Sequence, residues 1–240
     1  MKSLLAIDTA TDALSIALSL PQGLRVSHQN MPRRHQQQLF SSLDHLLDGD
    51  ALASLELDGI VFGSGPGSFT GLRIAVSAAQ GLGFSLGLPL VGVSSLETQA
   101  HTLLRLRAIS GPCLILSCID ARIKQVYAAS YFFDGSAVQV LSEAVVSSPE
   151  SLEPVKVPPH ARHVPVFGVG GGYAFKQAME KSWQHVSECW PEIQPEAQDM
   201  LGPACLLIES GDAMSPEKAA PDYVQRGSTW KKLAEQGRKS

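Results

Sequence analysis

The 240-residue sequence has little charge, few aromatic side chains and only four cysteines. Hydrophobic residues make up 44%, which excludes a largely disordered chain. No apolar run approaches the roughly 18–20 residues needed to span a bilayer, and Asp8 interrupts the apolar N-terminus too early for a secretory signal. We therefore expect a soluble, cytoplasmic protein with no membrane segment.

Spacings typical of metal sites are also missing. The cysteines form no CxxC pair, and no two of the seven histidines are spaced i, i+4, as zinc ligands on one helix face would be. His160 and His163 are three residues apart, but the preceding Pro158 and Pro159 place them in a predicted loop. We expect no metal site, and reduced cysteines in the absence of a secretion signal.

The charge is unevenly distributed along the chain. The formal net charge is −4, but residues 226–240 alone carry +4, so the remainder carries −8. An acidic body repels phosphate backbones, which argues against autonomous nucleic-acid binding over a broad surface. The basic tail, which contains Trp230, is the one segment for which we consider stacking or phosphate contact with RNA. The alternative is a solvated C-terminus.

The order of predicted elements indicates an α/β fold of two similar domains with mixed sheets, since strands followed by alternating helices and strands occur twice. We place the domains at residues 1–109 and 110–225, with a basic tail at 226–240 and a last helix able to pack back on the first domain. The predicted strands span residues 3–8, 13–20, 24–30, 59–63, 89–93, 113–119, 123–133, 137–141 and 164–168. The predicted helices span 34–48, 72–86, 95–107, 173–183 and 197–210.

The predicted helix at residues 72–86 is apolar on every side. Between Ile74 and Leu88 the only polar side chains are Ser77, Gln80 and Ser85. A helix of this kind is buried on more than one side. One face can cover the sheet of its own domain, and the other needs either an internal cover or another protein.

Three segments are candidates for phosphate binding. They are residues 8–11 (DTAT) at a hairpin turn, residues 63–71 (GSGPGSFTG) before a helix, and residues 168–172 (GVGGG) after a strand. Each has a structural alternative: a turn held by side chains, a helix N-cap at Ser68 or Thr70, and a flexible glycine cluster. None matches a Walker A loop, a dinucleotide fingerprint or a GxSxG nucleophile elbow.

Several separated segments together resemble the TsaB (YeaZ) family of bacterial proteins, which has the actin-like ATPase (ribonuclease H-like) superfold. GPGSFTGLR is the most specific match. The matching segments are IDTATDALSIAL, RRHQQQLFSSLDHLL, GPGSFTGLRIAVSAAQGLG, VGVSSLE, DARIKQVYAA and DYVQRGSTWKKL. The resemblance implies a role in tRNA threonylcarbamoyladenosine (t6A) synthesis.

The family is similar to TsaD, the catalytic subunit, which uses a metal held partly by an HxEGH segment. Ser95 and Gln99 stand at the two histidine positions here, and both are poor replacements for imidazole. In the second phosphate hairpin, Asp120-Ala121-Arg122 replaces the usual glycines, and Arg122 would enter or cap the phosphate space. The resemblance therefore implies a subunit with no metal and no catalysis of its own.

The resemblance also implies partners and sites. TsaB-like proteins pair with TsaD, and with themselves as homodimers, through the helices at 34–48 and 71–87. We expect an interface of His35, Leu39, Leu43, Leu72, Val76, Ala79 and Gly83. No cofactor is required, and weak ATP or ADP binding would use vestigial positions at Asp8, Thr9, Asp120, Gly170 and Gly171. The C-terminal P-x-Y-L-R pattern of the family reads Pro221 to Gln225 here, without its arginine.

The predicted function is that of a non-catalytic subunit for threonylcarbamoyl transfer to N6 of adenosine 37 in tRNAs that read codons beginning with A. It would stabilise TsaD, help recruit the P-loop ATPase TsaE, and meet tRNA only through the complex. The first alternative is an actin-like ATPase or phosphotransferase using Asp8 and Asp120. A peptidase is a further alternative, although Ser68 has no identifiable partner base.

Overall fold

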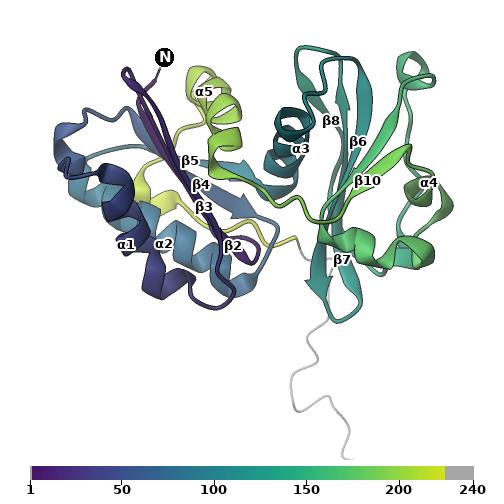
Figure 1. Cartoon of the computed structure of the whole chain (residues 1–240), viewed down its shortest axis with the longest axis horizontal. Coiled ribbons are helices and arrows are strands. Elements are labelled where there is room, and N and C mark those ends of the chain that lie inside the picture. The colour runs from purple at the N-terminus through teal and green to yellow at the C-terminus, as the bar shows by residue number, and fades with distance from the viewer. Residues whose placement is uncertain (1, 225–240) are drawn as a thin grey trace, which may run out of the picture.

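The computed structural model describes residues 2–224, which form two lobes side by side (Figure 1). The basic tail and Trp230 lie outside the described residues. The first lobe contains a five-stranded sheet in the order β3-β2-β1-β4-β5, and the second a five-stranded sheet in the order β10-β9-β6-β7-β8. The strands of the first sheet are β1 (Leu4–Asp8), β2 (Ala13–Leu20), β3 (Gly23–Asn30), β4 (Gly59–Gly65) and β5 (Leu90–Ser94). Those of the second are β6 (Cys113–Arg122), β7 (Gln125–Phe133), β8 (Val138–Ser147), β9 (Val166–Val169) and β10 (Glu188–Trp190).

Both sheets are mixed because each begins with a meander and continues through crossovers. β1 pairs antiparallel with β2 and parallel with β4, and β6 pairs antiparallel with β7 and parallel with β9. Short links allow antiparallel neighbours, whereas parallel neighbours need a longer connection. The predicted α/β fold with two similar mixed sheets is therefore confirmed.

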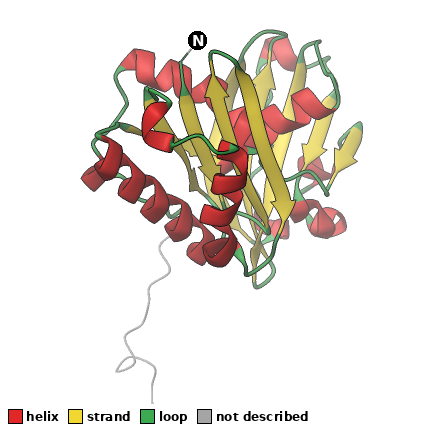
Figure 2. Cartoon of the chain, turned by 60° about the vertical axis from the view of Figure 1, so that its left-hand side comes forward, coloured by secondary structure: helices red, strands yellow, loops and turns green. Residues whose placement is uncertain are grey.

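Helices cover both faces of the first sheet. α1 (His35–Leu47) and α2 (Phe69–Leu86) lie on one face, and α5 (Leu201–Ser210) lies on the other (Figures 1 and 2). Alternate residues of β1 serve the two faces: Leu5 packs with Leu39 of α1, and Leu4 packs with Ala204 of α5. The helix at the end of the chain thus packs on the first sheet.

The helix α3 (Ser95–Leu106) packs on the second sheet, although it precedes every strand of that sheet. Leu96, Ala100 and Leu103 form its apolar stripe and contact Ile115 and Tyr131. Each sheet is therefore covered in part by a helix from the other half of the chain: α3 covers the second sheet and α5 covers the first. The strands of the two sheets are divided in the chain between β5 and β6, and the domain boundary between residues 109 and 110 stays a prediction.

The predicted helix at residues 173–183 is wrong. The chain forms 3-10 turns over Gly171–Ala178, becomes extended at Met179 and Glu180, and then forms the single-turn helix α4 (Lys181–Gln184). The Glu180 side chain accepts a hydrogen bond from Ser182 N and begins this new helix. The other 3-10 turns are Leu52–Ser54, Pro149–Ser151, Pro159–Ala161, Ala197–Met200 and Pro216–Lys218.

None of the helices within residues 2–224 is long and apolar enough to cross a membrane.

Candidate partner interface and interdomain cleft

A cleft of about 520 Å³ separates the two lobes. It is bordered by the β1–β2 turn, the glycine loop before α2, the β6–β7 turn and the segment after β10. The charged side chains that line it are Asp12, Asp120, Arg122 and Glu192. Because three carboxylates and only one guanidinium line the cleft, binding of a polyphosphate group is disfavoured unless cations accompany it.

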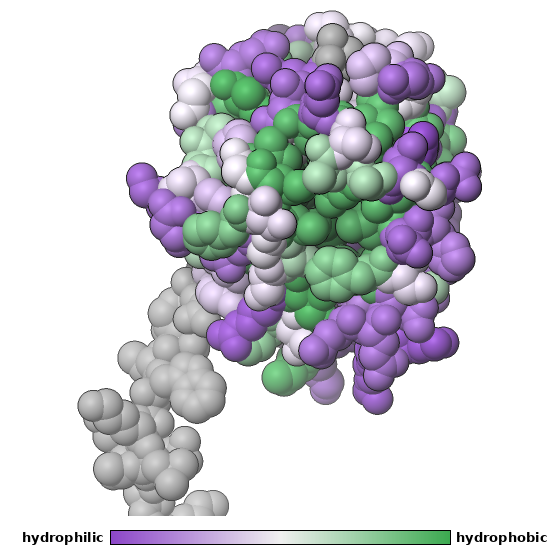
Figure 3. All heavy atoms as spheres, turned by 90° about the vertical axis from the view of Figure 1, so that its left-hand side faces the viewer, coloured by the Kyte–Doolittle hydropathy of each residue, from purple (hydrophilic) through white to green (hydrophobic). Residues whose placement is uncertain are grey.

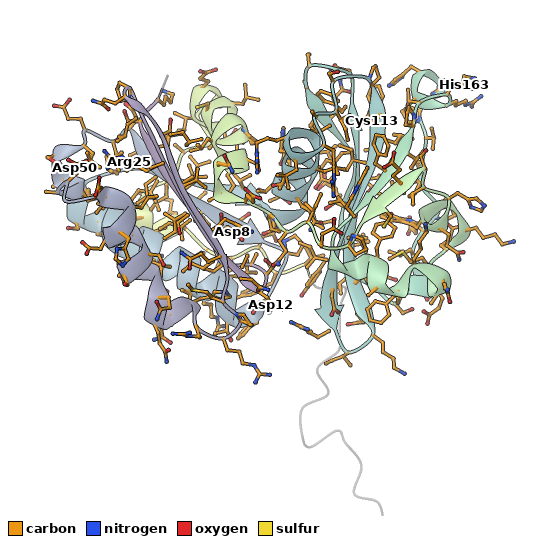
Figure 4. The ribbon with its side chains drawn as sticks, in the orientation of Figure 1. Asp8, Asp12, Arg25, Asp50, Cys113 and His163 are labelled. Atoms are coloured by element: carbon orange, nitrogen blue, oxygen red, sulfur yellow. The ribbon has the colours of Figure 1, made fainter. Side chains whose placement is uncertain are left out.

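Asp8 is buried inside the first lobe and does not line this cleft. Its Oδ1 accepts a hydrogen bond from Ala10 N at 3.0 Å, and its Oδ2 has no partner within the described chain. A β-carbon on Gly63 would overlap with Oδ2, so only glycine fits beside the carboxyl group. Burial raises the pKa of Asp8 to about 6. Figure 4 shows Asp8 within the lobe and Asp12 at its lower edge.

The glycine loop packs against the first hairpin turn. Thr9 Oγ1 donates to Gly71 O at 2.7 Å, and Ser68 N donates to Ala10 O at 2.7 Å. A β-carbon on Gly71 would overlap with Thr9 O. Ser68 also caps α2, since its Oγ accepts a hydrogen bond from Gly71 N. The N-cap interpretation of Ser68 is thus confirmed, and Thr9 is committed to the same contact.

The second hairpin contributes Asp120 and Arg122 to the cleft. Asp120 Oδ1 accepts a hydrogen bond from Arg122 N, and the Arg122 guanidinium reaches Asp12 Oδ1 of the first lobe at 3.4 Å. Gly171 also lines the cleft, whereas Gly170 packs closely against Cys118 and Gln99. Nucleotide binding stays a prediction, with Asp120 and Gly171 the predicted residues placed to meet a ligand there.

Gln99 and Ser95, where the sequence resemblance places the TsaD histidines, are both buried. Gln99 Nε2 donates to Ile193 O at 2.9 Å, and its Oε1 accepts from Ser117 Oγ at 2.8 Å. The amide therefore ties α3 to β6 and to the segment after β10. In residues 2–224, no group of three or more His, Cys, Asp or Glu side chains is placed to hold a metal ion. The sequence did not predict the hydrogen bonds of Gln99, because Ser117 and Ile193 lie far from it in the chain.

The side chains predicted to meet a partner are all buried, although Leu39 also borders a groove between α1 and α2 and His35 borders a neighbouring hollow. Leu39 and Leu43 pack beneath α1 against the first sheet, and Val76 and Ala79 pack against β4. The remaining predicted positions, His35, Leu72 and Gly83, are buried as well. An interface on α1 and α2 stays a prediction, and exposed side chains beside these buried positions would supply most of its surface.

The outer faces of α1 and α2 carry exposed aromatic rings. Phe40, Phe69 and Phe84 are 57%, 55% and 62% exposed. A groove of about 430 Å³ runs between the two helices and is lined by Phe40, Phe69, Ile74 and Ser77 among others. Figure 3, which views the molecule from this side, shows hydrophobic atoms at the centre and hydrophilic atoms around them. Large exposed apolar patches of this kind mark interaction sites. We call this surface the α1–α2 face.

The segment from Pro216 to Tyr223 covers part of the α2 surface that does not pack against the first sheet. Gln80 Nε2 donates to Pro216 O and Ala219 O, each at 3.1 Å, and Ala219 packs with Val76. Further along, Arg73 Nε donates to Tyr223 Oη at 2.9 Å. The cover of α2 is therefore partly internal, and within residues 2–224 the side chains of Phe69 and Phe84 on its outer face stay more than half exposed.

Two mixed sheets, each begun by a β-meander and facing the other across a cleft, define a protein of the actin-like ATPase superfold. A family model described as "TsaD: tRNA N6-adenosine threonylcarbamoyltransferase" matches residues 26–191. Two full-length relatives that carry the TsaB name show that the chain belongs to the TsaB (YeaZ) family, as its sequence resemblance predicted.

Two curated relatives match over nearly their full length, and both are named "tRNA threonylcarbamoyladenosine biosynthesis protein TsaB". The Escherichia coli protein is 33% identical over 235 residues, which is 96% of this chain and 97% of that protein. The Haemophilus influenzae protein is 30% identical over 244 residues, with the same coverage. A solved structure of YeaZ from Pseudomonas aeruginosa has a TM-score of 0.82 and 32% identity, covering 93% of this chain and all of that one.

Proposed function

We propose that this chain is a non-catalytic subunit for threonylcarbamoyl transfer to N6 of adenosine 37, in tRNAs that read codons beginning with A. It binds and stabilises a TsaD-type catalytic subunit and helps recruit TsaE. The names of the full-length relatives support the modification, and the TsaD family model supports a shared ancestry with the transferase.

The absence of catalysis by this chain is supported by the state of Ser95 and Gln99. Both hydrogen-bonding ends of the Gln99 amide are used within the protein, and Ser95 is buried. A hydroxyl and an engaged amide supply no strong ligand to a transition metal. The transfer chemistry therefore belongs to the partner.

The observation that carries the proposal is the exposed α1–α2 face. Three phenylalanines with more than half of their surface exposed lie on two neighbouring helices; Phe40 and Phe69 line the groove, and Phe84 lies further along α2. Their burial by a partner removes apolar area from water, which stabilises a complex by roughly 25 cal/mol per Å² before association costs. The same face supports a homodimer when the catalytic subunit is missing.

The acidic composition fits a subunit that meets tRNA through its partner. The net charge of −4 gives the surface no general attraction for phosphate. The catalytic subunit would hold the RNA, while this chain holds the catalytic subunit.

Binding to the TsaD of the same organism tests the proposal. Purified wild-type chain is mixed with TsaD and followed by size-exclusion chromatography, and t6A formation is assayed with each subunit omitted. Phe84→Asp should abolish co-elution and lower t6A formation, because it places a charge in an apolar contact. The matched control is Leu206→Asp, since Leu206 is 69% exposed on α5, on the opposite face of the sheet.

The proposal fails if the wild-type chain neither binds TsaD nor increases t6A formation. It also loses its structural basis if Phe84→Asp and Leu206→Asp behave alike while both variants keep the wild-type melting temperature.

A further inference from the structure

The turn between β6 and β7 has an unfavourable backbone for its sequence. Arg122, Ile123 and Lys124 have φ angles of 66°, 51° and 58°, all in the left-handed region. Arg122 pairs with Gln125, so Ile123 and Lys124 are the two central residues of the hairpin turn. Positive φ at both central positions is the pattern of a type I′ turn, which strongly prefers Asn-Gly. A β-branched residue with positive φ is an outlier in proteins.

Packing within residues 2–224 does not offset this strain at Ile123. Its side chain is 93% exposed, the highest fraction among the exposed large hydrophobic side chains of residues 2–224. The flanking Arg122 and Lys124 are exposed too. An apolar side chain held outward between two cations on a strained turn gives the isolated chain no stability. Strained positions of this kind persist at functional sites.

The turn is continuous with the α1–α2 face. Arg122 lines a surface hollow of about 880 Å³ together with His35 and Gln36 of α1 and with Thr70 and Ile74 of α2. Gln36, Thr70 and Ile74 also line the groove of the α1–α2 face. A subunit seated on that face therefore extends across the hollow toward the turn of the second lobe.

We propose that the Arg122–Lys124 turn is a second contact for the subunit that occupies the α1–α2 face, an inference that rests on the proposed function. Ile123 inserts into an apolar pocket of the partner, and Lys124 meets a carboxylate at the rim of that pocket, while Arg122 keeps its ion pairs with Asp12 and Asp120. Charges at a rim orient a complex, while the apolar side chain at the centre supplies affinity. The partner thus holds both lobes of this chain and fixes the cleft between them.

The test replaces the turn with its ideal sequence. Ile123→Asn combined with Lys124→Gly keeps the hairpin, relieves the backbone strain and removes the apolar side chain. We expect the melting temperature of the isolated chain to rise by about 2–4 °C. Affinity for the catalytic subunit, measured by isothermal titration calorimetry, should fall about tenfold or more. Val140→Asn is the control, because Val140 is 53% exposed on β8 of the same lobe. It should leave the affinity unchanged.

The outcomes are distinct. Unchanged pairing of the turn variant overturns the second contact and leaves the proposed function intact, whereas failure of the wild-type chain to pair overturns both. If the melting temperature of the isolated turn variant does not rise, the turn is not strained and the proposal loses that support. If the variant pairs normally but its complex binds tRNA more weakly, the turn is an RNA contact and the protein-contact proposal is wrong.

Discussion

Gln99 accepts a hydrogen bond from Ser117 Oγ at 2.8 Å, which joins the helix α3 to the first strand of the second sheet. The other end of the same amide donates to Ile193 O. The Gln99 side chain thus acts as a structural cross-link between three segments.

Replacing this cross-link should be costly. Gln99→Leu keeps the approximate volume but leaves Ser117 Oγ and Ile193 O buried without this partner. We expect a loss of about 2–3 kcal/mol in the free energy of unfolding, since each unsatisfied buried group costs roughly 1–3 kcal/mol. Urea unfolding measures the loss. Gln37→Leu, on the exposed side of α1, is the control and should change stability by less than about 0.5 kcal/mol. Equal stability of the two variants would show that the cross-link contributes nothing.

Two adjacent arginine substitutions should separate the core of α2 from its outer face. Val76 is buried against Ile60 and Phe62, so Val76→Arg places an unpaired charge in the core. We expect destabilisation by at least about 3 kcal/mol, or failure to fold. Ser77 is exposed and lines the α1–α2 groove, so Ser77→Arg should keep the melting temperature and weaken binding to the catalytic subunit. Circular dichroism and size-exclusion chromatography measure the two effects. A stable Val76→Arg variant that fails to pair would restore Val76 to the interface.

These helices also illustrate what the sequence could predict. The spacing of apolar side chains predicted both helices to within three residues of their observed ends. The start of α2 lies just after its N-cap residue, Ser68. The spacing could not decide which side of α2 meets the sheet, because a helix that is apolar all round carries no directional signal. The large exposed rings at Phe40, Phe69 and Phe84 became informative only when the packing was known.

The missed elements have similar physical causes. The strand β10 spans only Glu188–Trp190, too short for an alternating pattern. Residues 173–183 have helical composition, but the extended backbone at Glu180 divides them. The exchange of α3 and α5 between lobes depends on tertiary packing, since either sheet could accept an apolar stripe. For the same reason, the sequence placed Asp8 and Thr9 with Asp120 in one nucleotide site, although the glycine loop buries the first two.

The cleft should not hydrolyse ATP. Asp8 is buried and cannot reach a magnesium ion in the cleft, and Asp12, Asp120 and Glu192 repel the phosphates. We expect titration calorimetry with Mg·ATP to show binding weaker than about 1 mM, if heat is detected, and phosphate-release assays to show no turnover by the isolated chain. Saturable binding with turnover, lost in Asp120→Asn, would instead support the ATPase alternative.

The stability of the chain should depend on pH through Asp8. Its pKa is raised from 3.8 to about 6 in the folded state, because burial disfavours the charged form. The folded protein therefore holds this proton more tightly than the unfolded chain, and stability falls as the pH rises from about 4 to about 6 and then levels off. A shift of roughly two units corresponds to about 3 kcal/mol. Asp8→Asn stays neutral, retains an acceptor for Ala10 N and should lack this loss.

The difference between wild type and variant isolates Asp8 from the other carboxylates. Urea unfolding at pH 4.5 and pH 7.5 should show that Asp8→Asn gains stability relative to wild type by about 2 kcal/mol between the two conditions. Asp12→Asn is the matched control, since Asp12 is exposed at the mouth of the cleft and its charge remains in water. A difference between Asp8→Asn and wild type that is independent of pH would mean that the pKa of Asp8 is the same in the folded and unfolded chain, and a change of opposite sign would mean that the folded chain stabilises the carboxylate anion. Either result would contradict the desolvation argument, which rests on the close packing of Gly63 against Asp8 and on the missing hydrogen-bond partner of Oδ2 within residues 2–224.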